Sequence, residues 1–160
     1  MKGSGEDENK RLAMIWNSDS SAEGMCKRPV TSKPVKMKYG SLEEQEKDSN
    51  SIYQYYKDAI RIRNQFFSIV KGKTQVIESA SNDSFCIVEK VYENEKVCIF
   101  YNLSEQSSEV KLCDVTLADD TVLGENMLEA TLVTTEEGVV LTDGVMTMPA
   151  YSIAVYLVSE

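Results

Sequence analysis

The chain has 160 residues, of which 42% are hydrophobic and 27% are charged, a balance typical of a globular protein. Its 26 acidic and 17 basic side chains give a formal net charge of −9, and it contains no histidine. The lack of histidine excludes a Ser-His-Asp triad and any histidine-ligated metal site. No apolar run approaches the roughly 20 residues that a membrane-spanning helix needs, and the polar residues 1–11 are unlike a secretory signal.

The charges are distributed unevenly along the chain. Residues 1–50 have a net charge of zero, residues 51–73 have +4, and residues 74–160 have −13. An acidic surface repels phosphate groups, so we expect neither nucleic acid nor an anionic membrane as a partner.

The first 40 residues have little periodicity and are rich in glycine, serine and proline. One apolar patch, Leu12 to Trp16, interrupts them. Irregular segments of this length are unusual in a self-contained domain. The segment is therefore interpreted as a functional loop, a flexible tail or a part of something larger.

Two helices are predicted next, over about 41–48 and 51–71. A capping-box pattern opens each of them, at Ser41 and at Ser51. The second has an apolar stripe with three- and four-residue spacing, formed by Ile52, Tyr55, Tyr56, Ala59, Ile60, Phe66, Phe67 and Val70. We expect Gly72 to end it in the left-handed conformation. The stripe should cover a sheet, self-associate or stay exposed as an apolar patch.

Short strand-like runs fill the rest of the chain. We expect strands at 74–79, 84–92, 96–102, 108–114, 128–133, 138–142, 145–148 and 151–158. Asp143-Gly144 is typical of a tight hairpin turn. Strands with this spacing favour an antiparallel sandwich or a small barrel. The predicted fold class is mainly β: an antiparallel β-sandwich preceded by one long helix and an irregular N-terminal segment.

No pattern of chemical groups in the sequence is specific for a site. The acidic cluster Glu6-Asp7-Glu8 does not have the spacing of a calcium loop, and no metal or cofactor is expected. Cys86, Cys98 and Cys113 lie in apolar runs and are interpreted as buried, reduced side chains. Asn82 and Asn102 match the short glycosylation sequon. Among the aromatic residues, Trp16 and Tyr53 are the candidates for an exposed ring.

Four segments resemble the C-terminal end of α-amylase-family glycoside hydrolases. The segment from Gly3 to Trp16 is similar to the stretch after the eighth barrel strand, Asp-Glu-x-x-Arg-x-Pro-Met-x-Trp, with Ala13 in place of the proline. Residues 38–63 look like the last barrel helix and the stretch before it. Val97 to Ser104 and Met148 to Leu157 resemble two strands of the following domain. The order and spacing of these segments span nearly the whole chain.

The resemblance implies a division of the chain into two parts. Residues 1–73 would be a remnant of the barrel end, with the loop after strand eight and the last barrel helix, and residues 74–160 would be the β-sandwich domain C. The family's catalytic Asp nucleophile, Glu acid/base and assisting Asp stand at the ends of earlier barrel strands. None of them is carried over to this chain, which we expect to be inactive alone.

Two residues are candidates for substrate binding. Arg11 occupies the place of an arginine that reaches the substrate cleft in related α-glucosidases, although it could instead pair with Asp7 or Glu8 and order the loop. Trp16 is the second candidate.

The function that the resemblance implies is that of a non-catalytic C-terminal part of an α-glucan-degrading enzyme, whose domain C stabilises the barrel. The alternative is a stand-alone carbohydrate-binding sandwich module. A third possibility, a structural protein without a sugar role, fits the resemblance poorly. The expected partners are the rest of the barrel, a weakly bound α-glucan and a second copy docked through the helix stripe. The parent enzyme would be either cytoplasmic or secreted and bacterial.

Overall fold

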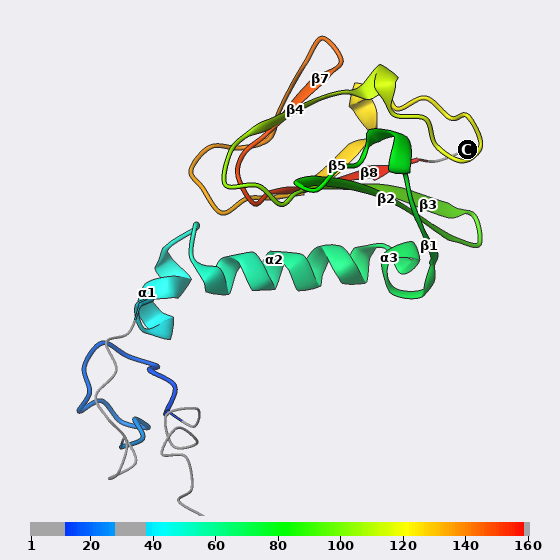
Figure 1. Ribbon diagram of the computed structural model, residues 1–160. Coiled ribbons are helices and arrows are strands. Elements are labelled where there is room, and N and C mark those ends of the chain that lie inside the picture. Colours follow the sequence, from blue (N-terminus) through cyan, green and yellow to red (C-terminus); the bar gives the residue numbers. More distant parts are fainter. Residues whose placement is uncertain (1–11, 28–37, 159–160) are drawn as a thin grey trace, which may run out of the picture. The chain divides into compact units, whose positions relative to one another are not determined.

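The computed structural model describes residues 12–27 and 38–158 (Figure 1). The chain forms two compact units, Met1–Gln54 and Tyr55–Glu160. The division between these units lies within the long helix, and the family-based division at residue 73 stays a prediction. In the described part of the chain, no helix is long and apolar enough to span a membrane.

The first unit contains helix α1 (Leu42–Lys47), and residues 12–27 have no regular secondary structure. The predicted capping box is confirmed: the Ser41 hydroxyl accepts a hydrogen bond from the Glu44 N–H, and the Glu44 carboxylate accepts one from the Ser41 N–H. Each end of a helix leaves main-chain groups without partners inside the helix. At the start of α1, the N–H groups of Leu42 and Glu43 donate to main-chain carbonyl groups of the preceding irregular segment.

The long helical stretch is divided into α2 (Ile52–Gln65) and α3 (Phe67–Lys71). Phe66 separates them with an extended backbone (φ −112°, ψ 112°) and has a buried side chain. The Glu95 carboxylate accepts a hydrogen bond of 2.6 Å from the Ser68 N–H in the first turn of α3. A tertiary contact therefore supports a break that the continuous apolar stripe does not indicate.

Gly72 ends α3, but the left-handed conformation predicted for it is wrong: its φ is −68° and its ψ is 151°. The reason for glycine is the space around it. A Cβ atom at this position would clash with the carbonyl oxygen of Ser68 and lie 3.0 Å from that of Val91.

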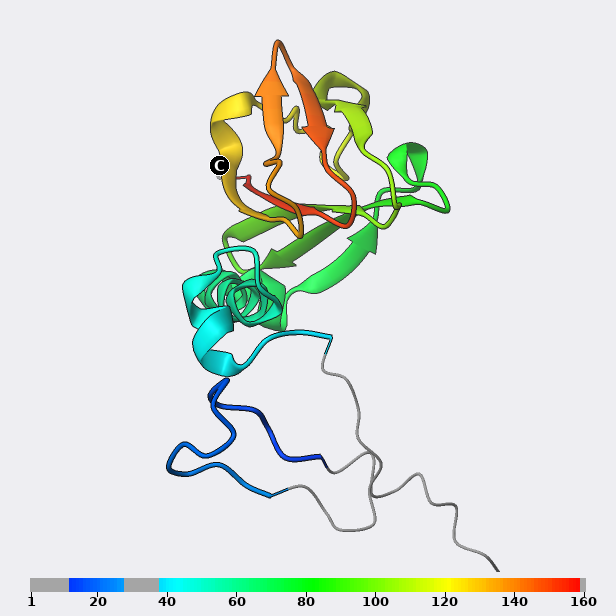
Figure 2. The same cartoon turned by 90° about the vertical axis from the view of Figure 1, so that its left-hand side faces the viewer.

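Two antiparallel sheets form the predicted sandwich (Figures 1 and 2). The strands of the larger sheet, in spatial order, are β1 (Lys73–Val76), β2 (Phe85–Tyr92), β3 (Glu95–Asn102), β8 (Ile153–Leu157) and β5 (Leu128–Leu132). Those of the smaller sheet are β4 (Ser108–Lys111), β7 (Val145–Met148) and β6 (Val140–Thr142). All of these strands pair antiparallel, and the sandwich is confirmed.

Apolar side chains are buried on both faces of the larger sheet. One cluster fills the space between the sheets and includes Ile87, Phe100 and Met146. A second cluster joins Ile62 and Phe66 to Val97, Ile99 and other residues of the larger sheet. Part of the helix stripe (Tyr55, Ala59 and Phe66) therefore covers a sheet. The rest stays exposed as apolar surface, so two of the three outcomes that the sequence analysis leaves open occur together: Ile52, Tyr56, Ile60, Phe67 and Val70 are exposed.

Two of the predicted strands are shorter than expected because each gives way to a short 3-10 helix, η2 (Glu78–Ala80) and η3 (Leu112–Asp114). The turn at η3 exposes Cys113, so the prediction that this thiol is buried is wrong. Cys98 is buried as predicted, and burial raises the pKa of its thiol to about 12. A further 3-10 helix, η4 (Glu125–Met127), precedes β5.

Candidate functional site

The segment around Trp16 is held by the start of α1. The carbonyl oxygen of Ile15 accepts a hydrogen bond of 2.9 Å from the Leu42 N–H, and that of Trp16 accepts one of 3.1 Å from the Glu43 N–H. The Asn17 side chain donates to the Glu43 carboxylate at 2.6 Å. These bonds fix the backbone and leave 49% of Trp16 exposed. Among the sequence-predicted site residues, Trp16 therefore presents an available ring surface.

The other candidate, Arg11, and its alternative partners Asp7 and Glu8 lie outside the described residues. Tyr39, in the same unit as Trp16, is equally exposed, and the Lys38 ammonium lies 5.4 Å from the centre of its ring. Tyr53 is half-buried. The structure thus describes the position of Trp16, and the proposed substrate-binding roles of Trp16 and Arg11 both stay predictions.

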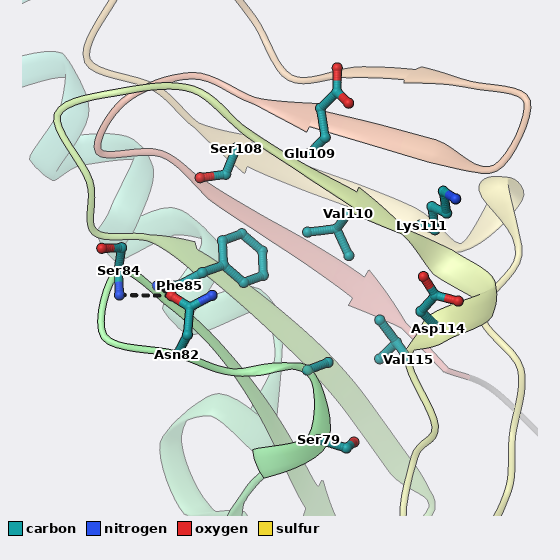
Figure 3. A pocket seen from close by; sticks show the side chains of 11 residues that line it. Ser79, Asn82, Ser84, Phe85, Ser108, Glu109, Val110, Lys111, Asp114 and Val115 are labelled. Carbon is teal, nitrogen blue, oxygen red and sulfur yellow. Dashed lines mark hydrogen bonds between the residues drawn. The ribbon is translucent and has the colours of Figure 1, made fainter.

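A pocket that the sequence analysis missed lies at one open side of the sandwich (Figure 3). It has a volume of about 410 Å³, and its walls come from β4, from η3 and from residues 79–85, which lead from η2 into the start of β2. Polar and charged residues line much of it: Ser79, Asn82, Ser84, Ser108, Glu109, Lys111 and Asp114. The only sequence signal in this region is the Asn82-Asp83-Ser84 sequon.

Hydrogen bonds within the turn fix one wall of this pocket. The Asn82 Oδ1 atom accepts from the Ser84 N–H and from the Phe85 N–H, each at 2.9 Å. An asparagine used in this way mimics a turn of the main chain. The Asn82 side-chain oxygen is therefore committed to the turn, whereas its Nδ2 atom has no hydrogen-bond partner among the described residues.

A charged pair secures another part of the sandwich. The Lys96 ammonium donates to the Asp119 carboxylate, which also accepts from the Thr121 hydroxyl at 2.7 Å. These hydrogen bonds, first that of Lys96 and then that of Thr121, hold the pKa of Asp119 well below its usual range. A carboxylate with a lowered pKa is a poor proton donor near neutral pH. Asp119 is therefore better suited to anchoring its loop than to acid catalysis.

Asn102 of the second sequon is excluded as a modification site in the folded protein. It is buried, and its Nδ2 atom donates to the carbonyl oxygens of Gln106 (2.8 Å), Met148 (3.1 Å) and Pro149 (2.8 Å). Asn82 of the first sequon is exposed. Within residues 12–27 and 38–158, no group of three or more cysteine and acidic side chains is arranged to hold a metal ion.

Comparison with known proteins places this geometry in a family. The chain is 34% identical to Eubacterium rectale Amy13B, with a TM-score of 0.83 over 96% of this chain and 28% of that protein. It is 28% identical over 104 residues to Alpha-amylase 3 of Dictyoglomus thermophilum, which is 65% of this chain and 21% of that protein. No family model matches the chain.

A more distant structure supports the fold alone. The α-amylase from H. orenii shares 22% identity over 75% of this chain and 22% of its own, with a TM-score of 0.55. The chain spans between a fifth and a third of the length of each of these relatives. The chain is therefore a part of an α-amylase-family protein, and its antiparallel β-sandwich is of the domain C type.

Proposed function

We propose that this chain is a non-catalytic C-terminal part of an α-amylase-like glycoside hydrolase that acts on α-glucans. In this role the sandwich and its helix stabilise the catalytic barrel. The proposal rests on the likeness to Amy13B over nearly the whole chain and on one structural observation, the second apolar side of α2.

One side of α2 is already packed. Tyr55, Ala59 and Ile62 contact the cluster on the larger sheet. Tyr56 and Ile60, which lie four residues apart and so on one face of the helix, are 62% and 57% exposed. Exposed apolar surface of this kind is typical of an interface. The last barrel helix, which α2 resembles, would turn this face to the barrel.

The strand arrangement agrees with a non-catalytic role. In the family, the catalytic carboxylates stand at the ends of parallel barrel strands. The described strands of this chain all pair antiparallel, so none of them has the parallel arrangement of a barrel strand. The chemistry would then belong to the part of the enzyme that this chain does not span.

The test is association with a barrel. Amy13B shortened by the part that this chain matches would be mixed with the purified chain, and complex formation would be followed by analytical ultracentrifugation and by the thermal midpoint of the barrel. We expect a one-to-one complex and a higher midpoint. The double variant Tyr56→Ser/Ile60→Ser should weaken the complex at least about tenfold, since each buried apolar side chain contributes about 1.5–3 kcal/mol.

The matched control is Val122→Ser, because Val122 is 69% exposed on a loop of the sandwich. This variant should bind like the unaltered chain. Formation of a dimer of the chain with no binding to the barrel would contradict the proposal, and so would hydrolysis of maltoheptaose by the chain alone.

A further inference from the structure

We propose that the pocket between β4 and residues 79–85 is a non-catalytic binding site for a neutral, polyhydroxylated ligand, an α-glucan segment. The choice of an α-glucan rests on the proposed function, whereas the choice of a neutral sugar-like ligand rests on the pocket itself. The described residues that line the pocket do not include Trp16.

The first step in the argument is the shape of the pocket wall. All four residues of β4 line the pocket, whereas a strand that turned one face to it would contribute only alternate residues. The pocket therefore lies along the free edge of β4, which pairs with β7 alone among the described strands.

The second step is the main-chain groups on that edge. The Leu112 N–H donates to the Gly144 carbonyl, and the register pairs Lys111 with Val145. Because hydrogen-bonded and open positions alternate in an antiparallel ladder, the main-chain groups of Glu109 and Lys111 point away from β7. This edge therefore supplies main-chain donors and acceptors at two positions, Glu109 and Lys111. Two positions are too few to add a peptide strand, but they suit the hydroxyl groups of a sugar ring.

The third step is the opposite wall. Asn82 is fixed by its two hydrogen bonds to the turn, so its Nδ2 atom is a preorganised donor. Ser79, Ser84 and Ser108 add hydroxyl groups, each able to donate and to accept. Groups of this mixed kind match sugar hydroxyls, which also donate and accept.

The fourth step is the charge and the floor of the pocket. Figure 3 shows the Glu109 carboxylate directed away from the hollow, while Lys111 and Asp114 bring opposite charges to one end. The net charge of −13 over residues 74–160 disfavours anionic ligands. Phe85 and Val110 supply apolar surface at the base, against which the C–H groups of a sugar ring could pack.

The experiment is a titration of the full chain with maltoheptaose, followed by amide NMR shifts. We expect saturable shifts at Asn82, Ser84 and residues 108–111, with a dissociation constant on the order of 1 mM, because the pocket has no exposed aromatic ring for stacking. Asn82→Asp keeps the turn acceptor but removes the Nδ2 donor, so it should weaken binding about fivefold. Lys111→Met changes the facing wall of the pocket and should also weaken maltoheptaose binding.

Asn64→Asp adds the same negative charge on the exposed side of α2 and should leave the affinity unchanged. Absence of shifts up to about 10 mM sugar, far above the expected constant, would overturn the inference. So would binding that neither pocket variant alters. Loss of sugar binding with intact barrel association would reject this site alone. Failed barrel association with intact sugar binding would reject the proposed function.

Discussion

The side-chain nitrogen of Asn102 lies 2.8 Å from the carbonyl oxygen of Pro149, 47 residues later in the chain. The same oxygen accepts a hydrogen bond of 2.6 Å from the Ser152 hydroxyl, and the Asn102 N–H donates to the Ser152 carbonyl at 2.9 Å. Asn102 and Pro149 belong to the two sandwich segments that carry the family resemblance. These segments therefore meet, and the contact that joins them is structural.

We predict that Asn102→Ala destabilises the protein by about 3 kcal/mol, because it removes three hydrogen bonds that the buried Asn102 Nδ2 atom donates to main-chain carbonyl groups. Urea unfolding followed by circular dichroism measures this change. Asn64→Ala removes an exposed side chain from α2 and should change stability by less than about 0.5 kcal/mol. Equal effects of the two substitutions would show that the buried network contributes little.

Gly72→Ala should destabilise the protein by about 1–3 kcal/mol, the range for forcing an atom into filled space. The added Cβ would meet the carbonyl oxygens of Ser68 and Val91. Gly138→Ala is the control, because a Cβ at Gly138 would meet no atom within 4 Å. Similar unfolding midpoints for both variants would argue against this steric role of Gly72.

Ser68→Ala should be neutral or stabilising. Ser68 is fully buried, and its hydroxyl oxygen has no hydrogen-bond partner among the described residues. Removing an unsatisfied buried polar group eliminates its desolvation cost. The main-chain bond to Glu95 remains, since it uses the Ser68 N–H. A marked loss of stability in thermal unfolding would mean that the hydroxyl has a partner, such as a bound water.

The Lys96–Asp119 pair predicts a specific dependence of stability on pH. The folded-state pKa of Asp119 is lowered, so the pair stabilises the fold fully above the unfolded pKa of about 3.9. This contribution decreases as the pH falls below that value, because the unfolded state binds the proton more readily. Asp119→Asn should therefore reduce the loss of thermal stability between neutral pH and about pH 3.

The neighbouring Asp120→Asn is the control for that measurement, since no ion pair of Asp120 is found in the described part of the chain. It should retain the pH dependence of the unaltered chain. An identical pH profile for Asp119→Asn would show that the ion pair does not couple to folding.

Local patterns predicted much of the fold. The capping box at Ser41 depends on residues three positions apart and forms as expected. Asp143 and Gly144 adopt φ values of 51° and 74°, as a tight hairpin requires. The apolar run at 84–92 predicted a strand, and β2 spans Phe85–Tyr92. Each of these features depends on neighbours in the sequence.

Other features were not predictable because distant residues produce them. The break at Phe66 is supported by Glu95, which caps the next helix from β3. Part of the reason for glycine at position 72 is the close approach of the Val91 carbonyl oxygen, which leaves no room for a Cβ atom. The candidate pocket is lined by Asn82, which precedes β2 of the larger sheet, and by β4 of the smaller sheet. No periodicity in the sequence records which loops meet when two sheets stack.

The sequence by itself determined that this chain has an irregular start, a helical stretch and an antiparallel sandwich, and its motifs indicated the α-amylase family. Apolar periodicity and turn residues are local properties, so they can be recognised from the sequence alone. Only the tertiary structure decided which side of α2 is packed, which left Tyr56 and Ile60 exposed. It also decided where unpaired polar groups gather, because sheet order and loop packing depend on contacts between residues far apart in the chain.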